Sequence, residues 1–332
     1  MKNTSANKGS DFVYYKLPDK IDVNFLSGEI KNAVGESATG FIIRPFDSKE
    51  KPLFLAGKSK IYKPNNFPDN ETFHYSNQIP EGKTKEHYRG LVAKGLQAIN
   101  DGSFSKVVLS RTKKIALPKG FSPQGFFTKI CEAYPNAFVY LFSSPQYGTW
   151  LGASPEVLLT INGKSLKTMA LAGTVVNGGI FTNKEKLEQR SVTGYIVDIL
   201  GKYSENLTIK QPSIKKAGNI EHIITEIAAE YNGALLPILE ELHPTPAVGG
   251  LPKTEAVNFI LENEGYDRSL YSGYLGPVNK DKADIFVNLR CMQFFNEDAV
   301  LYAGAGIVNG SVPENEWQET ENKMNTLLTH IK

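Results

Sequence analysis

Hydrophobic and polar residues alternate with the two-residue period of a β-strand through much of the middle and the C-terminal part of the chain. Successive side chains of a strand point to opposite faces, so this period predicts strands that bury one face more than the other. The predicted strands cover residues 104–116, 137–143, 148–161, 165–175, 270–278, 284–295 and 299–308. Many of them follow one another without a long crossover, which favours antiparallel sheets over parallel ones.

Other segments repeat their apolar residues every three or four positions, as an amphipathic helix does. The predicted helices cover residues 84–100, 184–202, 219–231, 252–263 and 313–331. Gly102 and Gly265 stand just beyond the ends of two of these helices, and Pro252 and Pro313 stand at the starts of two. Strands and helices together predict the α+β class.

The chain shows no internal repeat, low-complexity tract or linker that would divide it. We expect residues 1–10 to form a disordered tail and residues 11–332 to form a single catalytic domain. Its N-terminal part, residues 11–80, is expected to be a smaller layer.

Composition and charge indicate an ordinary globular protein with a small-molecule partner. The 332 residues are 41% hydrophobic, and 37 basic and 35 acidic residues leave a net charge of +2. The two signs are interspersed, so no field that would collect nucleic acid is predicted. Only Cys131 and Cys291 occur, without metal-ligand spacing, and the first residues lack a signal-peptide core. We therefore expect a cytoplasmic protein that binds neither membrane nor nucleic acid, as a monomer or a weak dimer.

Lys106 and Glu156 are the first candidates for chemistry. Lys106 lies at a strand position where an apolar side chain is usual, so it either reaches to the sheet edge or is kept neutral and acts as a base. Glu156 follows Pro155 and precedes an apolar run, so it is either an exposed turn residue or a general acid. Taken alone, each structural alternative is the commoner one.

Three further residues are candidates within predicted helices and strands. His222 lies beside the isoleucines of the predicted helix 219–231, and Glu188 lies in the helix 184–202. Their ordinary roles are a hydrogen-bonded structural histidine and a surface charge. Arg290 lies inside a strand pattern, where an arginine usually forms a salt bridge or binds an anion.

The segment 301–323 combines a glycine-rich strand with an acidic helix. Gly304 and Gly306 allow the backbone to approach a ligand closely. Glu316, Glu319 and Lys323 fall on one face of the helix that follows. This arrangement suits a metal ion beside an anion, although an acidic first helical turn with an exposed Glu/Lys pair has the same sequence. A further Pro/Gly-rich segment, HPTPAVGGLPK at residues 243–253, is suited to lining a pocket with backbone.

In this order the motifs KVVLSR, GASPEVLL, ALAGT, HPTPAVGGLPK, YSGYLG, AGAGIV and EWQETENK closely resemble the chorismate-utilising enzymes, and among them the isochorismate synthases of menaquinone and siderophore biosynthesis. The resemblance runs from about residue 91 to residue 332. It implies an α+β fold of two lobes, with large antiparallel sheets that face each other, helices outside and the active site between the sheets.

The resemblance also implies roles for the candidates. It makes Lys106 the base that activates water and Glu156 the acid that protonates the departing hydroxyl group. It implies Mg²⁺ as the cofactor and chorismate as the substrate. The implied magnesium ligands are Glu188, Glu319 and, directly or through water, Glu316. The implied substrate-binding residues are Gly173, Thr174, His222, Ala247, Arg290, Gly304 and Lys323.

Ala247 bears on which nucleophile the resemblance implies. Relatives that use ammonia usually carry a hydroxyl residue at this position, so Ala247 favours water and an isomerase that converts chorismate to isochorismate. A salicylate synthase, an anthranilate or aminodeoxychorismate synthase component, and a catalytically silent homologue that acts as a binding partner stay open as alternatives. The chain departs from the family pattern at Gln189, where histidine is common, and in its short N-terminal part.

Overall fold

The computed structural model describes residues 10–31, 39–63, 71–176, 178–217, 220–231, 233 and 235–331, so most of the expected N-terminal tail lies outside the described residues. The first strands are β1 (Asp11–Lys16), β2 (Val23–Lys31), β3 (Gly40–Arg44), β4 (Leu53–Tyr62), β5 (Lys106–Ala116), β6 (Phe138–Ser144), β7 (Gly148–Ser154), β8 (Val157–Asn162) and β9 (Ser165–Val176). The later strands are β10 (Ser204–Ile209), β11 (Ser213–Ala217), β12 (Ile220–Tyr231), β13 (Gly250–Leu251), β14 (Tyr274–Asn279), β15 (Lys282–Val287), β16 (Cys291–Phe294) and β17 (Asp298–Val308). The helices are α1 (Lys85–Asn100), α2 (Pro123–Ala133), α3 (Asn183–Tyr203), α4 (Leu235–Leu242), α5 (Lys253–Asn263) and α6 (Pro313–Leu328).

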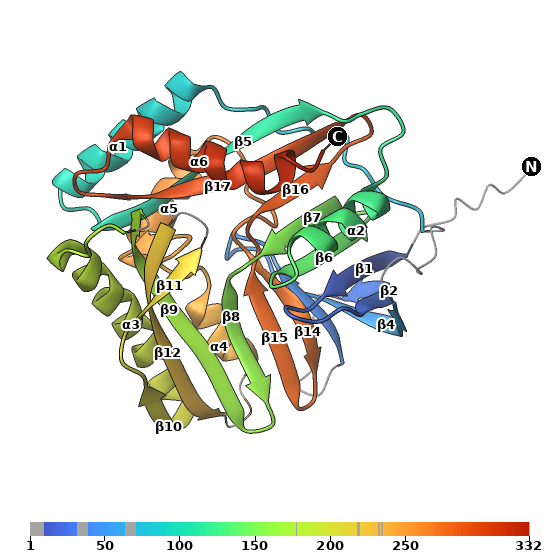
Figure 1. Cartoon of the computed structure of the whole chain (residues 1–332), viewed down its shortest axis with the longest axis horizontal. Helices are drawn as coiled ribbons and strands as arrows, with labels where there is room; N and C mark the ends of the chain where they lie inside the picture. Colours follow the sequence, from blue (N-terminus) through green and yellow to red (C-terminus); the bar gives the residue numbers. More distant parts are fainter. Residues whose placement is uncertain are drawn as a thin grey trace, which may run out of the picture.

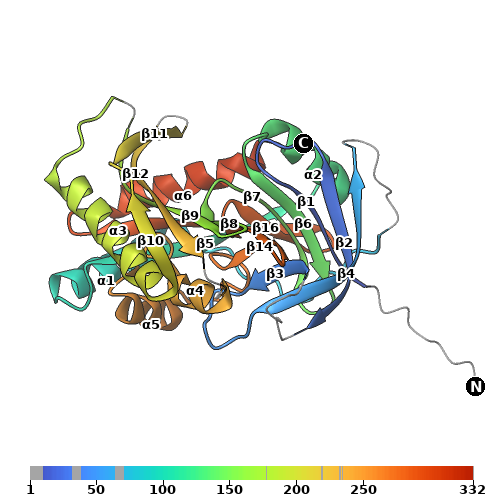
Figure 2. The same ribbon diagram turned by 90° about the horizontal axis from the view of Figure 1, so that it is seen from below.

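The strands form one continuous antiparallel sheet. Its pairings run from β12 through β9, β8, β15, β14, β3, β4, β2, β1, β6, β7, β16 and β17 to β5, while β10 and β11 pair with β12 and β13 pairs with β5. Figures 1 and 2 show β12, β10 and α3 at one end of the molecule and β1, β2, β4 and α2 at the other. The predicted α+β class with antiparallel strands is confirmed.

Helices cover the sheet in three places, each with its own apolar core. Residues of α3 and α4 pack on β8, β9, β12 and β15, with Leu200 and Ile285 fully buried between them. Residues of α2 and the C-terminal part of α6 pack on β6, β7, β16 and β17. Residues of α1 and α5 pack on β5, around Leu109 and Ile260. This packing holds β5, α3 and α6 in place against the sheet, and these three elements carry much of the predicted site.

Four of the predicted helices are confirmed as α1, α3, α5 and α6, and Gly102 and Gly265 take the positive φ angles expected beyond a helix end. The predicted strand 148–161 is two strands, because Pro155 and Glu156 interrupt it. The predicted strand 284–295 is also two strands, so the prediction that Arg290 lies inside a strand is wrong. Arg290 lies in the break, with a φ of 48°.

The prediction of a helix over residues 219–231 is wrong, because Ile220–Tyr231 is strand β12. Ile220, Ile223, Ile224 and Ile227 fit a helical stripe, but isoleucine is branched at Cβ and favours strands. Ile223, Thr225 and Ile227 are buried on one face, and β12 has strand neighbours on both sides. Pairing within the sheet therefore decides the conformation, and His222 is a strand residue.

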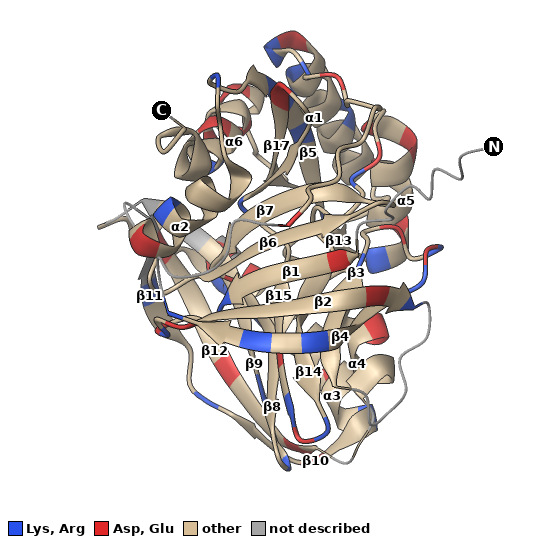
Figure 3. Ribbon diagram, turned by 90° about the vertical axis from the view of Figure 1, so that its right-hand side faces the viewer, with Lys and Arg blue, Asp and Glu red and all other residues tan. Residues whose placement is uncertain are grey.

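The N-terminal strands complete the sheet. Sequence analysis predicted a smaller layer before residue 80 without its strands, and the structure places β1–β4 between β14 and β6. Basic and acidic positions are both spread over this face (Figure 3). Within the described residues, no helix is long and apolar enough to cross a membrane.

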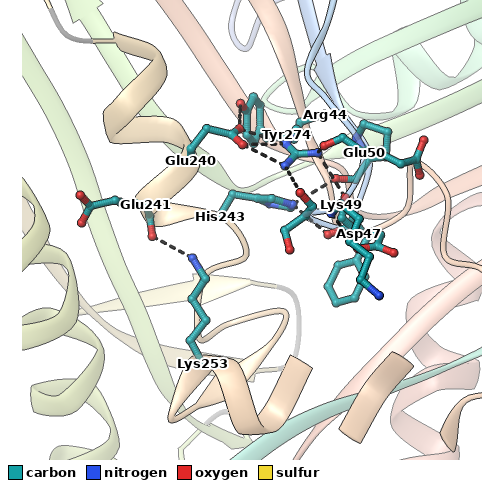
Figure 4. A network of polar contacts seen from close by, with 12 residues as sticks. Arg44, Asp47, Lys49, Glu50, Glu240, Glu241, His243, Lys253 and Tyr274 are labelled. Atoms are coloured by element: carbon teal, nitrogen blue, oxygen red, sulfur yellow. Dashed lines mark hydrogen bonds and ion pairs between the residues drawn. The ribbon is translucent and has the colours of Figure 1, made fainter. Parts of the chain in front are cut away.

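A partly buried polar network connects β3 to α4 (Figure 4). The Arg44 guanidinium is 2% exposed and pairs with Glu240 at 2.9 Å, and Tyr274 donates to the same carboxylate at 2.8 Å. His243 Nε2 lies 3.1 Å from the carbonyl oxygens of Pro45 and Phe46. The N-terminal strands are thereby tied to the residue that opens the segment HPTPAVGGLPK.

Candidate active site

One half of the sheet contains β8 and β15 and the other contains β7 and β16, and the chain crosses between these halves at two adjacent breaks, which place Glu156 beside Arg290. Strand β7 pairs with β16 and strand β8 pairs with β15, so the links β7–β8 and β15–β16 run side by side. The amide of Val287 donates to the Glu156 carbonyl oxygen at 3.0 Å, and the amide of Ala153 donates to the Arg290 carbonyl oxygen at 3.0 Å. The backbone thus positions an acid and a guanidinium at the junction of the halves.

The Glu156 carboxyl group is set in a protein environment that favours its protonated form. Part of the residue remains accessible, yet burial raises the pKa of Glu156, while Lys323, Lys106 and Arg290 oppose that shift. A carboxyl group with a raised pKa near cations can hold and then release a proton. This environment agrees with the predicted role of general acid.

Lys106 lies at the start of β5 with its side chain 11% exposed. Its Nζ donates to Glu188 Oε1 of α3 at 2.6 Å. Gly306 of β17 lies beside it, because a methyl group there would be 3.5 Å from Lys106 Cε and 4.0 Å from Nζ. The absence of a side chain at residue 306 leaves the amine approachable from β17.

Helix α6 brings Lys323 and Glu319 to the same region. Lys323 Nζ lies 2.6 Å from Glu319 Oε1 and donates to the Gly304 carbonyl oxygen at 2.7 Å. Lys323 also opposes the pKa shift of Glu156, as noted above. Glu316 lies one turn earlier, and it and Glu319 both contribute to raising the pKa of Tyr88, after burial. Because α6 is a regular helix over Pro313–Leu328, Glu316, Glu319 and Lys323 lie on one face of it, as predicted.

His222 and Gly173 meet where β12 pairs with β9. His222 is paired with Thr174 and Ile223 with Ala172, so Gly173 is the extra residue of a bulge. Gly173 has a φ of 70°, and a Cβ there would lie 2.8 Å from the Glu185 carbonyl oxygen. Burial lowers the pKa of His222, and Lys323 lowers it further, so the imidazole is neutral at pH 7.

Electrostatic contacts link the residues that sequence analysis proposed from five separate segments. Burial lowers the pKa of Arg290, and Tyr271, Glu319 and Glu156 oppose this shift. Besides burial, Lys323 and Arg290 lower the pKa of His222, and Glu319 raises it. Strands β5 and β12, helix α6 and the two strand breaks therefore converge on one site.

A small cavity of about 20 Å³ adjoins this site. Glu156 and Ala247 both line it, so the predicted acid and the residue predicted to select the nucleophile share one space. Thr245 also lines it, and sequence analysis missed this residue. A hydroxyl residue two positions before Ala247 in a pocket-lining segment was the available signal.

A larger hollow of about 530 Å³ lies elsewhere, between β5, α6 and residues 82–83. It is lined by Arg111, Trp317 and Glu321 among others, and none of the predicted site residues lines it. Arg111 and Lys113 already pair with Glu321 there. The convergence of acid, base and cations locates the candidate active site better than the size of a hollow does.

Carboxylate oxygens are the ligands that Mg²⁺ prefers, so the donor set Glu188, Glu316 and Glu319 fits this ion chemically. Within the described ranges, no three His, Cys, Asp or Glu side chains are arranged to hold a metal ion. Glu188 and Glu319 are instead each 2.6 Å from a lysine ammonium group. A metal ion at these carboxylates would replace an ammonium group as their positive partner.

Comparison with known proteins identifies the class to which this antiparallel α+β fold and its polar site belong. Residues 55–332 match the sequence model of the chorismate binding enzyme family, and the chain belongs to that family. The isochorismate synthase MenF of Pasteurella multocida is 30% identical over 73% of this chain and 60% of its own length. The salicylate biosynthesis isochorismate synthase of Pseudomonas aeruginosa is 32% identical over 73% of this chain and 54% of its own length. This chain thus spans somewhat more than half the length of these relatives.

The fold itself is shared with a solved structure. The menaquinone-specific isochorismate synthase MenF of Escherichia coli matches 98% of this chain and 90% of its own with a TM-score of 0.80, at 23% identity. At that identity the likeness concerns the fold, and it agrees with the fold that the resemblance implied.

Proposed function

We propose that this protein is an isochorismate synthase that converts chorismate to isochorismate with the aid of Mg²⁺. The observation that carries the proposal is the convergence of Lys106 and Glu156, an amine and a carboxyl group with a raised pKa, on one site within the chorismate binding enzyme fold. Relatives named isochorismate synthase, at 30% and 32% identity, support the choice within the family.

In the proposed reaction water adds at C2 of chorismate and the hydroxyl group at C4 departs. Lys106 takes a proton from the attacking water, and Glu156 gives a proton to the departing hydroxyl group, which leaves as water. For this, Lys106 has to give up its ion pair with Glu188 and present a neutral amine. Arg290 and Lys323 supply positive charge for the two substrate carboxylates, and the neutral His222 offers a hydrogen bond without adding charge.

We propose that Glu188, Glu316 and Glu319 hold the magnesium ion. When bound, Mg²⁺ supplies positive charge against a substrate carboxylate and against these glutamates. The ion pairs at Glu188 and Glu319 support this assignment, because each carboxylate already has a basic side chain as its partner at 2.6 Å. Displacement of Lys106 from Glu188 would also free the amine for its role as base.

Ala247 supports water as the nucleophile. Its methyl group offers no hydrogen bond to hold an attacking amine, whereas threonine would offer a hydroxyl donor and acceptor. Ala247 lines the same cavity as Glu156, the proposed acid, and this supports a role in the choice of nucleophile. Specificity that depends on one small group is worth about 1–3 kcal/mol, so the main product is the criterion and not its purity.

The test is chromatography of products after incubation of the protein with chorismate, with and without Mg²⁺ and ammonium. We expect an equilibrium mixture of chorismate and isochorismate that forms from either side and does not consume ammonium. Anthranilate or aminodeoxychorismate as the main product would contradict the choice of water. Salicylate with stoichiometric pyruvate would show that the protein is a salicylate synthase. A folded protein that does not turn over chorismate would favour the alternative of a catalytically silent homologue.

A further inference from the structure

The cavity lined by Glu156 contains a buried hydroxyl group, that of Thr245, to which the proposed function assigns no role. Thr245 is 9% exposed and lines the cavity, and its Oγ1 finds no hydrogen-bond partner within the part of the chain that the structure describes. Its carbonyl oxygen accepts from the amides of Val248 at 3.0 Å and Gly249 at 2.9 Å. The turn therefore holds the backbone of Thr245 in place.

The size and lining of the cavity suit one water molecule. A space of about 20 Å³ exceeds the minimum of roughly 10–15 Å³ that a single water requires, and a buried water needs two to four polar partners. Glu156, Thr168 and Thr245 supply oxygen atoms among the lining residues. Thr168 Oγ1 donates to the Leu158 carbonyl oxygen at 2.6 Å and can still accept.

The rest of the lining is apolar. It consists of Val157, Leu158, Met169, Leu171, Val192, Ile196, Leu242, Ala247 and Val287. A buried hydroxyl group without a partner destabilises the fold, whereas a water that bridges it to a neighbouring oxygen satisfies both. Among the described lining residues, only Glu156, Thr168 and Thr245 have side-chain oxygen atoms that could bind such a water.

We propose that Thr245 binds a single water in this cavity and that this water orients the carboxyl group of Glu156, so that Thr245 is a positioning residue for the acid. The role of Glu156 as acid rests on the proposed function. A protonated carboxyl group has one O–H donor, and a water that donates to its other oxygen fixes which oxygen carries the proton. The charged groups that face Glu156 are Lys106 from β5, Arg290 from the β15–β16 link and Lys323 from α6.

Two substitutions at one position test the proposal. Thr245→Val keeps the shape and removes the hydroxyl group, whereas Thr245→Ser keeps the hydroxyl group and removes a methyl group. We expect Thr245→Val to lower kcat about tenfold, as the loss of one positioned hydrogen bond would, with KM within about twofold. Its kcat should also extend to higher pH, by about half a unit to one unit, because the Glu156 anion loses a solvating group. Thr245→Ser should recover kcat and the pH profile of the natural protein.

Circular dichroism and thermal unfolding confirm that both variants fold. A kcat and a pH profile of Thr245→Val that match those of the natural protein would overturn the proposal. An equal fall in kcat for both variants would also overturn it, since that result indicates packing and not hydrogen bonding.

A high-resolution crystal structure tests the water without any assay. We expect the water in the natural protein and in Thr245→Ser, and not in Thr245→Val. A cavity without water in the natural protein would overturn the proposal even if isochorismate is formed. If the protein forms no isochorismate, the proposed function fails separately, and the crystal structure still decides whether Thr245 binds the water.

Discussion

Two glycines of β17 should respond differently to the same substitution, Gly304→Ala through stability and Gly306→Ala through activity. Gly304 and Gly306 are two residues apart, so an alanine methyl group at either position points to the same face of the sheet. At residue 304 the methyl carbon would lie 3.0 Å from the Leu109 carbonyl oxygen and 3.0 Å from Tyr271 Oη. At residue 306 it would meet nothing closer than Lys106 Cε at 3.5 Å.

The contact distances set the expected magnitudes. Gly304→Ala crowds a backbone oxygen of the paired strand, and overpacking of this kind costs about 1–3 kcal/mol. Unfolding entropy of about 2.1 cal/mol/K per residue gives roughly 0.7 kcal/mol/K for 332 residues, so Tm should fall by about 1–4 °C. Gly306→Ala makes only ordinary contacts, and its Tm should stay within about 1.5 °C of the natural protein.

Activity should respond differently from stability. The methyl group of Gly306→Ala would lie 4.0 Å from Lys106 Nζ, on the side from which β17 leaves the amine approachable. We expect kcat/KM for chorismate to fall by about 10–100-fold, because displacement of a reacting group by about 1 Å has effects of that size. Gly90→Ala is the control, since Gly90 is exposed on α1 and a Cβ there meets nothing within 4 Å.

Calorimetry on the three variants tests the predicted changes in Tm, and initial-rate assays test the predicted change in kcat/KM. If Gly306→Ala keeps the kcat/KM of the natural protein, the inference that the Lys106 amine is approached past Gly306 is refuted. An unchanged Tm in Gly304→Ala would refute the packing argument independently of any activity.

The remaining predictions concern the acid, the base, the metal and a buried histidine. Lys106→Ala and Glu156→Gln should each reduce turnover about 10²–10⁴-fold without loss of fold, and turnover near that of the natural protein in either would remove its assignment. Excess chelator should abolish activity and Mg²⁺ restore it, with Glu319→Gln requiring more Mg²⁺, whereas activity that persists in chelator would exclude the metal. Because burial raises the pKa of Glu156 in the folded protein, its contribution to stability is present at low pH and is lost as pH rises through the folded pKa. Glu156→Gln should therefore melt at a higher temperature than the natural protein at pH 8, by a difference that shrinks towards pH 4, and calorimetry showing no such trend would contradict this. Burial lowers the pKa of His243 to about 3 from an ordinary 6.5, so the stability that its neutral form provides should be lost as pH falls from about 6.5 towards 3. His243→Gln should show a weaker loss of Tm over that range, and an equally steep loss would assign the acid sensitivity to other groups.

Sequence reasoning named residues that the structure brings close together, but it missed several of the strands around them. Pro155 indicated an interruption of the ladder, and the structure places Glu156 at that interruption. Local patterns could not show that the neighbouring strands break at the same level, which is what brings Arg290 beside Glu156. That arrangement depends on register between β8 and β15 and between β7 and β16, and register is a property of pairing.

The error at β12 has a related cause. The spacing of Ile220, Ile223, Ile224 and Ile227 satisfies a helical period, and a strand of the same composition buries only part of that set on one face. Sheet neighbours on both sides supply hydrogen bonds that the local sequence does not reveal. Among the strands before residue 63, β1 and β3 join the rest of the sheet through β6 and β14, which lie far along the chain, whereas β2 and β4 pair, among the described residues, only within this group.

The pairing of β5 with β17 has a consequence for how the molecule is made. Lys106 is opposite Val308, so the strand that carries the proposed base meets its long neighbour β17 only after all the strands from β6 to β16 have been synthesised. Glu156 lies between these two strands in the sequence, and the helix with Glu319 and Lys323 follows β17. Contacts between such distant segments slow folding, because a long loop has to close before they form. A growing chain that stops before residue 298 would lack β17 and leave most of β5 unpaired, so we expect the site to assemble only after α6 has been synthesised and such truncated chains to aggregate.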